Sequence, residues 1–343
     1  MPDELSVSVI IPVYNGAATL PAGLRALRKQ TYPLDEVIVV DDGSTDSSGD
    51  IARGFGVRVI SQSNAGPAAA RNRGAAAAQG DILLFTDADC VPAPDWAERM
   101  VTAFTGPGVV GVKGVYRTRQ RGLVARFVQA EYEDRYDRMR ALETIDFVDT
   151  YSAGYRRDIF LASGGFDTSF PTASVEDQEF SFRLAEAGHR LVFVPDAQVF
   201  HIHDRTLGEY ARRKFWIGYW KVRVMREHPD KLVRDSHTPQ VLKLQVGLAA
   251  LGGLLVVGGV LTPASSFEPG RWLALAGPLA WAALLISGLP FLAKLLRRDP
   301  AVVFVAPLLL FVRAWALGLG FLAGLLRLPA ERTGYREASS SPP

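Results

Sequence analysis

The chain has 343 residues, a length typical of about two domains, and it carries a formal net charge of +2. So small an excess of positive charge gives no reason to expect nucleic acid as a partner. The chain has a single cysteine, Cys90, which excludes an intrachain disulfide. We expect no signal peptide, because no basic region followed by an apolar region precedes the first strand.

Apolar runs and helical patterns alternate over the N-terminal part of the chain. Four runs have the character of buried strands: Val7–Val13, Glu36–Val40, Val57–Ile60 and Ile82–Thr86. Between them, Leu20, Leu24 and Leu27 recur at helical spacing, and Pro67 opens an alanine-rich helix that extends to Ala78. This alternation predicts a parallel sheet with right-handed crossovers.

Polar clusters lie at the ends of these strands or on the helix before the fourth. They are Tyr14-Asn15, Asp41-Asp42, Ala70-Arg71-Asn72, and Asp87 with Asp89. Ligands of open α/β sheets bind at the carboxyl edge of the strands, and paired carboxylates can hold a divalent cation together with a substrate diphosphate. Aspartates are also common in turns, so Asp42 before Gly43 has that alternative. The convergence of the clusters favours a binding site, with Cys90 as a small packing residue beside it.

The motifs carry a family resemblance. Val9-Ile10-Ile11-Pro12-Val13-Tyr14-Asn15, Val40-Asp41-Asp42-Gly43-Ser44-Thr45-Asp46, Ala70-Arg71-Asn72 and Asp87-Ala88-Asp89 resemble the inverting family 2 glycosyltransferases of GT-A fold, over about residues 5–230. The resemblance implies an α/β fold with a mixed, mostly parallel sheet flanked by helices. It also implies a hexosyltransferase that uses a nucleotide-sugar donor, for which we expect a UDP-sugar, and Mg²⁺ or Mn²⁺ in a single displacement.

The resemblance assigns roles to the motif residues. The donor-binding positions are Pro12, Tyr14, Asn15, Asp41, Asp42, Arg71, Asp87 and Ala88. The metal positions are Asp87 and Asp89, and His201 is added because the family often has a histidine there, with His203 as the alternative. A histidine ligand suits Mn²⁺ better than Mg²⁺. Structural packing of either histidine is equally compatible with the sequence.

A general base is expected further along the chain. The family's Glu-Asp motif matches Glu176-Asp177, which makes Asp177 the expected base and Glu176 its catalytic neighbour. Ser174 and Asp177 also fit a capping box, in which the carboxylate only satisfies a helix N-terminus. A helix N-terminus would favour the ionised form that a base needs. Gly165, in Gly164-Gly165-Phe166-Asp167, resembles the acceptor-side loop of the family.

One stretch departs from the processive polysaccharide synthases of this family. Their Gln-x-x-Arg-Trp motif aligns with Arg212-Arg213-Lys214-Phe215-Trp216, which keeps only the tryptophan, so a non-processive enzyme is expected. The segment of about residues 205–228 mixes basic and aromatic side chains. This mixture predicts an amphipathic helix at an anionic bilayer surface, with Arg213 and Trp216 on the acceptor or membrane side; a soluble basic face is the alternative.

Three long apolar stretches follow, at residues 244–261, 272–293 and 301–326. Each is near or above the length of about 20 residues that spans a bilayer. We therefore expect a cytoplasmic catalytic domain over residues 1–230, a membrane domain of about three helices over 231–328 and a disordered tail over 329–343. Lys294, Arg297 and Arg298 place the second connection in the cytoplasm, which makes this a multi-pass inner (plasma) membrane protein. Three spans would put Arg327 outside, and a re-entrant segment would remove that conflict.

Arg313 lies near the middle of the last apolar stretch. A charge there is a functional candidate that could face a lipid phosphate, and snorkelling or a helix–helix contact are the alternatives. A membrane anchor together with a catalytic domain predicts a lipid or lipid-linked acceptor and a role in cell-envelope polysaccharide or glycolipid synthesis. A processive synthase, a catalytically silent scaffold and a nucleotidyltransferase are the competing hypotheses, and the oligomeric state is left open.

Overall fold

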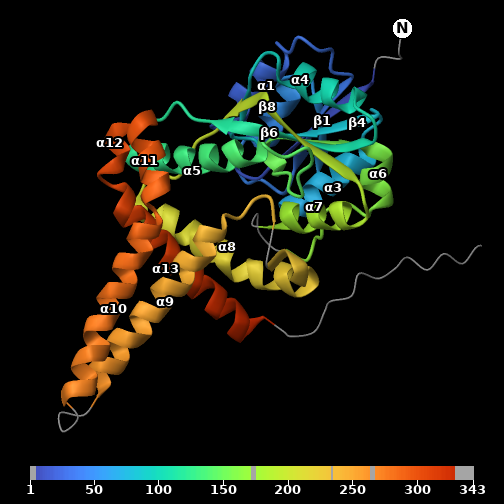
Figure 1. The fold of residues 1–343 in the computed structure, drawn as a ribbon. Helices are drawn as coiled ribbons and strands as arrows, with labels where there is room; N and C mark the ends of the chain where they lie inside the picture. Colours follow the sequence, from blue (N-terminus) through green and yellow to red (C-terminus); the bar gives the residue numbers. More distant parts are fainter. Residues whose placement is uncertain (1–4, 171–174, 233–234, 263–266, 329–343) are drawn as a thin grey trace, which may run out of the picture.

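The computed structural model describes residues 5–170, 175–232, 235–262 and 267–328. An α/β domain packs on a group of long C-terminal helices (Figure 1). The strands are β1 (Val7–Val13), β2 (Glu36–Asp41), β3 (Arg58–Ser61), β4 (Ile82–Phe85), β5 (Val91–Pro92), β6 (Val109–Arg117), β7 (Ala153–Arg156) and β8 (Arg190–Phe200). The helices of this domain are α1 (Leu20–Leu27), α2 (Ser48–Gly54), α3 (Pro67–Ala77), α4 (Trp96–Thr102), α5 (Leu123–Met139), α6 (Arg157–Ala162), α7 (Glu176–Glu186) and α8 (Leu207–Glu227).

The eight strands form one mixed sheet in the order β3-β2-β1-β4-β7-β6-β8-β5. The four strands expected from the sequence pair in parallel, whereas β7 is antiparallel to both β4 and β6. The register pairs Val13 with Asp41, and Asp41 with Ser61, so neighbouring strands end together. The expected GT-A-like fold class, with a mostly parallel sheet flanked by helices, is confirmed.

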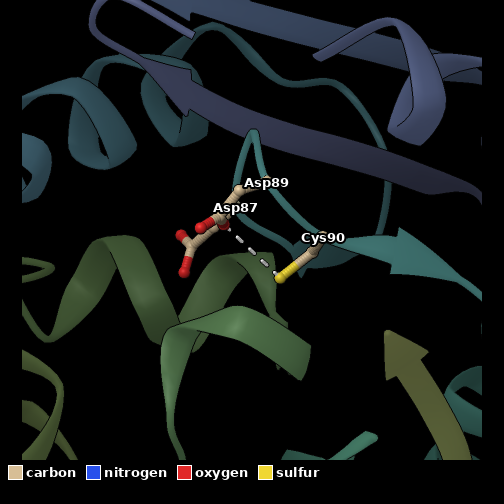
Figure 2. A group of neighbouring side chains, drawn as sticks. All are labelled: Asp87, Asp89 and Cys90. Carbon is tan, nitrogen blue, oxygen red and sulfur yellow. Dashed lines mark hydrogen bonds between the residues drawn. The ribbon is translucent and has the colours of Figure 1, made fainter. Parts of the chain in front are cut away.

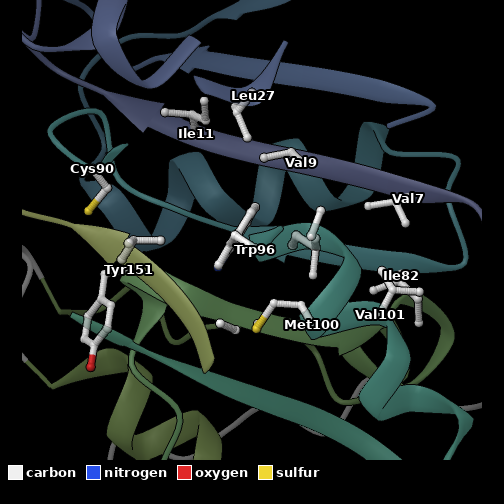
Figure 3. Packing of buried hydrophobic residues seen from close by; sticks show 14 of the residues in the cluster. Val7, Val9, Ile11, Leu27, Ile82, Cys90, Trp96, Met100, Val101 and Tyr151 are labelled. Atoms are coloured by element: carbon white, nitrogen blue, oxygen red, sulfur yellow. The ribbon is translucent and has the colours of Figure 1, made fainter. Parts of the chain in front are cut away.

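The sheet is buried on both faces, which explains the continuous apolar runs of β1 and β4. Val7, Val9 and Ile11 point to one side, where they pack with Leu27, Trp96 and Met100 (Figure 3). Ile10 points to the other side and joins a cluster that includes Ala70 of α3 and Phe180 of α7. Successive side chains of one strand therefore anchor helices on opposite faces, and these helices hold the loops at the sheet edge in place.

The C-terminal helices are α9 (Gln240–Leu261), α10 (Phe267–Ser287), α11 (Leu289–Arg298), α12 (Pro300–Val303) and α13 (Ala306–Arg327). Among the described residues, α9 and α13 are each long and apolar enough to cross a membrane. The expected second segment, 272–293, is interrupted: residues Leu275–Ser287 and α11 meet at a bend of 44°, and a third span exists only if this bent pair counts as one. Gly288 and Pro290 lie at that break. The tail, 329–343, lies outside the described residues.

Helix α8 and helix α13 pack with their backbones in contact. A Cβ added at Gly320 would collide with the carbonyl oxygen of Phe215, and one added at Gly324 would collide with that of Tyr219. Small residues permit this close approach, as they do at helix crossings within membranes. The segment 205–228, expected to form an interfacial helix, contains the helix α8, and one face of this helix is covered by α13 (Figure 1).

Candidate active site

The loop after β1 is held by an amide side chain. Asn15 adopts a left-handed conformation with φ of 53°, which asparagine tolerates better than most residues. Its Oδ1 accepts a hydrogen bond from the backbone N–H of Thr45 at 2.8 Å, and its own N–H donates to Oγ of Ser44 at 3.0 Å. Tyr14, at 54% exposed, stands outside this network beside the half-buried Pro12. The first two loops at the carboxyl edge are therefore joined.

The two aspartates after β2 differ in their surroundings. Asp42 is buried, and its carboxylate accepts hydrogen bonds from Nε2 of Gln62 at 2.7 Å and from the N–H groups of Ala65 at 2.8 Å and Gly66 at 2.9 Å. Protein donors thus occupy this side chain, and they position the loop that leads into α3. Asp41 is half-buried, and Oδ1 accepts from the N–H of Ser44 at 3.0 Å. Of the two, Asp41 has the larger capacity for a further donor.

The acidic pair after β4 lies at the same edge (Figure 2). Asp87, Asp89 and Cys90 each offer one possible metal-ligand atom, and these three atoms lie within 4.8 Å of one another. Nε2 of His201, which follows β8, donates to Oδ2 of Asp89 at 3.1 Å. Burial opposes ionisation of Asp89, but the hydrogen bond and charge of His201 outweigh it, so the pKa of Asp89 lies below its usual range. Ala88 lies between the two carboxylates and is half-buried.

The side chains in this group suit a divalent cation of the hard or borderline type. Carboxylate oxygens are ligands for Mg²⁺ and Mn²⁺, and an imidazole nitrogen is better suited to Mn²⁺. Cys90 does not fit such an ion, because sulfur is a soft ligand that suits neither Mg²⁺ nor Mn²⁺; burial also raises the pKa of its thiol well above the usual value. Asp87, Asp89 and His201 are therefore the residues here that could hold a metal, and Cys90 packs in the core beneath them.

His203, the alternative histidine, contacts His201 at 3.3 Å between the two Nδ1 atoms and has its other partners on α5. It is buried, stacks on Tyr132 of α5 at 5.6 Å between ring centroids, and donates from Nε2 to Oε1 of Gln129 at 3.0 Å. Burial lowers the pKa of His203 to about 3, which keeps the ring neutral. Its place is structural, in the packing between β8 and α5.

Arg71 joins the acidic pair to the expected base motif. Its guanidinium is buried and donates from Nη2 to Oδ1 of Asp87 at 2.8 Å and from Nη1 to Oε1 of Glu176 at 3.0 Å. Arg71 and Glu176 are 105 positions apart in the sequence. Glu176 is itself buried. The guanidinium of Arg71 therefore supplies hydrogen bonds to both carboxylates that water would otherwise supply. Arg71 is thus bound to two side chains of the protein.

Asp177 follows Glu176 in the first turn of α7 and is half-buried. Its Oδ2 accepts from the N–H of Thr150 at 3.3 Å, and its Oδ1 accepts from the N–H of Gln178 at 2.8 Å. Burial and then the charge of Glu176 raise the pKa of Asp177 to about 7. This result is opposite to the helix-terminus effect expected from the sequence, because desolvation and a like charge outweigh it. Ser174 of the expected capping box lies outside the described residues.

The loop expected to face the acceptor is fixed by α3. Gly165 has φ of +68°, and an added Cβ would lie 2.5 Å from Oδ1 of Asn72. The same amide binds the backbone of Phe166 twice, donating to its oxygen at 2.7 Å and accepting from its N–H at 2.9 Å. Asn72 therefore holds this loop next to Arg71, the residue that binds Glu176. The sequence motif contained Asn72, but its partner was not evident.

The residues assigned to the membrane side occupy three different environments. Arg213 donates from Nε to Oδ2 of Asp204 at 2.7 Å, and Trp216 is 46% exposed. Arg313 is buried and donates from Nη1 to Oε1 of Glu131 at 2.7 Å and from Nη2 to Oε1 of Gln245. The helix–helix contact that the sequence allowed for Arg313 is what the structure contains.

A buried ionic junction was not foreseen from the sequence. Glu131 of α5 binds Arg313 of α13 and also Nζ of Lys214 of α8, at 3.0 Å. Gln245 of α9 continues the junction by donating to Oγ of Ser287 at 3.1 Å. A second buried pair, Lys113 with Asp149, lies beside the segment that supplies the N–H of Thr150 to Asp177. A lysine within the apolar strand β6 was the sole local signal for that pair.

Comparison with known proteins agrees with this geometry. The fold and the acidic edge define a GT-A-type transferase, and residues 8–162 match the family model described as glycosyl transferase family 2. The chain is 35% identical over 230 residues to glycosyltransferase AglE of Haloferax volcanii, a match that spans 64% of this chain and 73% of AglE. The chain therefore belongs to glycosyltransferase family 2 and is a glycosyltransferase.

Two further relatives extend the likeness. The pre-mycofactocin glycosyltransferase of Mycobacterium tuberculosis is 32% identical over 240 residues, which cover 67% of this chain and half of that protein. A mannosyltransferase of Pyrobaculum calidifontis, PcManGT, solved in complex with GDP-Man and Mn²⁺, superimposes with a TM-score of 0.58 at 22% identity and covers 94% of this chain and 88% of its own. At that identity the structural likeness shows a common fold alone.

Proposed function

We propose that this chain is a metal-dependent, inverting, non-processive glycosyltransferase that moves one sugar from a nucleotide-diphosphate donor to a membrane lipid or lipid-linked acceptor. The observation that supports it most is the continuous ionic chain from Asp87 through Arg71 to Glu176, next to Asp177. This chain supports the proposal because direct ion pairs connect the acidic pair expected to meet the diphosphate with the neighbour of the expected base. The bound GDP-Man and Mn²⁺ of PcManGT supply an analogy for the donor and the metal.

Each residue has a chemical role in the proposal. Asp87, Asp89 and His201 would hold a divalent cation, which when bound offsets the negative charge that develops on the departing diphosphate. Asp177 accepts the proton of the acceptor hydroxyl as the bond from that oxygen to the anomeric carbon forms and the bond from that carbon to the diphosphate oxygen breaks. A carboxylate whose pKa is near 7 is well matched to such proton transfer at neutral pH.

The donor nucleoside is proposed to lie between Tyr14 and Asp41. Asp41 keeps capacity for a base N–H or a ribose hydroxyl, whereas Asp42 is occupied by three donors of the protein. Tyr14 is exposed at the same edge and offers a ring against which a base can stack. Arg71 is then a positioning residue, because both ends of its guanidinium are bound to carboxylates.

The membrane placement is part of the same proposal. We assign α9, α10 and α13 to the membrane domain and the α/β domain to the cytoplasmic side. Lys294 and Arg298 of α11 form ion pairs with Asp134 and Asp137 of α5 at 2.8 and 2.9 Å, so the basic connection lies on the α/β domain. Basic connections prefer the cytoplasmic side. A non-processive role is supported by Arg212 and Phe215, which stand in place of the glutamine and the arginine of Gln-x-x-Arg-Trp.

The test is lipid mass spectrometry after the purified full chain, in native lipid extract, is incubated with Mn²⁺ and a panel of nucleotide sugars. We expect one donor to give a lipid heavier by a single sugar residue, and Asp89→Ala to give none. Asp95→Ala is the matched control, since Asp95 is an exposed partner of Arg99 at the start of α4. A ladder of added sugars would identify a processive synthase, and turnover undiminished in Asp89→Ala would refute the metal assignment.

A further inference from the structure

A cavity of about 200 Å³ lies between the α/β domain and the C-terminal helices. Its walls come from α5, the start of α9, the break between α10 and α11, and α13. The polar residues that line it are Glu131, Asp134, Arg135, Gln245, Ser287, Lys294 and Arg313. Pockets that enclose whole drug-sized ligands measure about 300–1,000 Å³. This cavity therefore has room for a polar head group and not for a complete lipid.

The charges around the cavity favour an anion. Arg135, Lys294 and Arg313 contribute three cations, against the carboxylates of Glu131 and Asp134. Lys214 binds Glu131 from the side of α8 and offsets its charge further. Arg313 is only 7% exposed, and its Nε has no hydrogen-bond partner among the described residues although both Nη atoms are bound. A buried guanidinium N–H without an acceptor is costly, and its uncompensated charge adds to the positive potential at the cavity wall.

In the proposed membrane placement, the cavity lies at the level of the lipid head groups on the cytoplasmic side. Lys294, Arg297 and Arg298 follow the break between α10 and α11, and clusters of this kind mark the cytoplasmic end of membrane helices. Apolar side chains are exposed close by, among them Leu244 of α9, Leu289 of α11 and Leu308 of α13. These surfaces would accept acyl chains while the head group enters the cavity.

We propose that this cavity binds the phosphate head group of an anionic bilayer phospholipid. Basic pockets between membrane helices on the cytoplasmic side are a recurrent way of binding such lipids. The inference rests on the membrane placement in the proposed function, but not on sugar transfer. The bound phosphate would join α5 to α11 and α13, and so hold the catalytic domain against its membrane helices.

The sugar acceptor is a poorer occupant, because aromatic rings separate the cavity from the acidic edge. The guanidinium of Arg135 lies over the ring of Tyr132 at 5.3 Å. Tyr132 packs edge-on against Tyr116 at 5.2 Å, and Tyr116 stacks on His201, the partner of Asp89, at 4.5 Å. A phosphate that touches Arg135 from the cavity is therefore separated from Asp89 by the rings of Tyr132, Tyr116 and His201.

The test is native mass spectrometry of the full chain released from vesicles of phosphatidylcholine with equal amounts of phosphatidylglycerol, without any nucleotide sugar. We expect the wild type to retain phosphatidylglycerol and not phosphatidylcholine, and the double variant R135Q/K294Q to retain about tenfold less. Arg297→Gln is the matched control, because it removes a cation from the same helix outside the cavity lining; it should retain as much as the wild type.

A second variant guards against a folding defect. Lys294 is 45% exposed, so Lys294→Met should fold normally and show a smaller loss of the anionic lipid. Equal retention of the two phospholipids, or equal losses in Arg297→Gln and R135Q/K294Q, would overturn the proposal. In a separate arm, polyprenyl phosphate that displaces phosphatidylglycerol in equimolar competition would show that the cavity belongs to the acceptor. Sugar transfer is not read out, so failure of the proposed function would leave these results unchanged.

Discussion

The carboxyl edge of the sheet and the ionic junction between α5 and α13 both bring charged groups together, but they are assembled in different ways. At the edge, Asp41 ends β2 and Asp87 lies two residues beyond β4, so a short motif places each side chain. At the junction, Glu131 meets Arg313, which lies 182 residues further along the chain. A site at the ends of successive strands can therefore be recognised from sequence, whereas a site made by distant helices needs the structure.

The largest expected effect tests the edge. Asp177→Asn keeps the size of the side chain but cannot accept the acceptor's proton, so transfer should fall by about 10²–10⁴-fold while donor binding is retained. Transfer rates and donor affinity, measured by nucleotide competition, check this. Glu186→Gln, at the other end of α7, is the matched control and should transfer normally. Near-normal transfer in Asp177→Asn would reduce the role of Asp177 to capping the helix, or would indicate an acceptor that is already ionised.

The next effect tests the junction. Glu131→Gln leaves Arg313 and Lys214 without a countercharge in a buried place, and breaking such a group costs about 3–5 kcal/mol of unfolding free energy. Chemical unfolding in detergent, followed by circular dichroism, measures the loss. Glu133→Gln changes the same chemistry two residues away, at a half-exposed ion pair with Arg117, and should cost about 0–1 kcal/mol. Equal losses of unfolding free energy in the two variants would mean that the buried junction stabilises the protein no more than the half-exposed ion pair does.

The same contrast explains what could be predicted from sequence. The first four strands, the parallel pairing and the acidic edge follow from local periodicity and from turns after strands, and they agree with the structure. The antiparallel β7 was not foreseen, because its four residues carry no alternating pattern. The partners of Arg71 and Arg313 could not be predicted either, since a carboxylate 105 or 182 residues away leaves no trace in the neighbouring sequence. The apolar stretch of 272–293 concealed the break at Gly288 because glycine and proline are common within membrane helices.

A smaller effect is expected at the loop that α3 holds. Gly165→Ala would place a side chain in a left-handed conformation and against Oδ1 of Asn72, which should cost about 1–3 kcal/mol. Thermal unfolding measures this change. Gly54→Ala is the control, because its Cβ would meet nothing within 4 Å on a helix and should leave stability equal or slightly higher. A stable Gly165→Ala protein would show that the loop adapts and is not fixed by Asn72.

The smallest effect is a pH dependence that belongs to the edge alone. The pKa of Asp177 is raised to about 7, so the base form is lost as the pH falls, and transfer should drop about tenfold per pH unit below 7 and level off above it. Since this pKa is above the ordinary value of 3.8, the group's contribution to folding is present at low pH and is lost as the pH rises through about 7. A comparison of the pH–rate profiles of the wild type and Asp177→Asn checks the assignment. If the rate of the variant falls with pH as steeply as that of the wild type, a group other than Asp177 is titrating.

The glycine contacts between α8 and α13 have a mechanical consequence. Gly320 and Gly324 lie directly against the backbone of α8, so no side chains separate the two helices at these points. We therefore expect α8 and α13 to move together as one rigid body. In the proposed membrane placement, we therefore expect a change in bilayer thickness to tilt the whole catalytic domain, because the two helices do not slide past one another. Spin-label distances between these helices should stay constant in thin and thick bilayers, while the orientation of the sheet relative to the lipid surface changes.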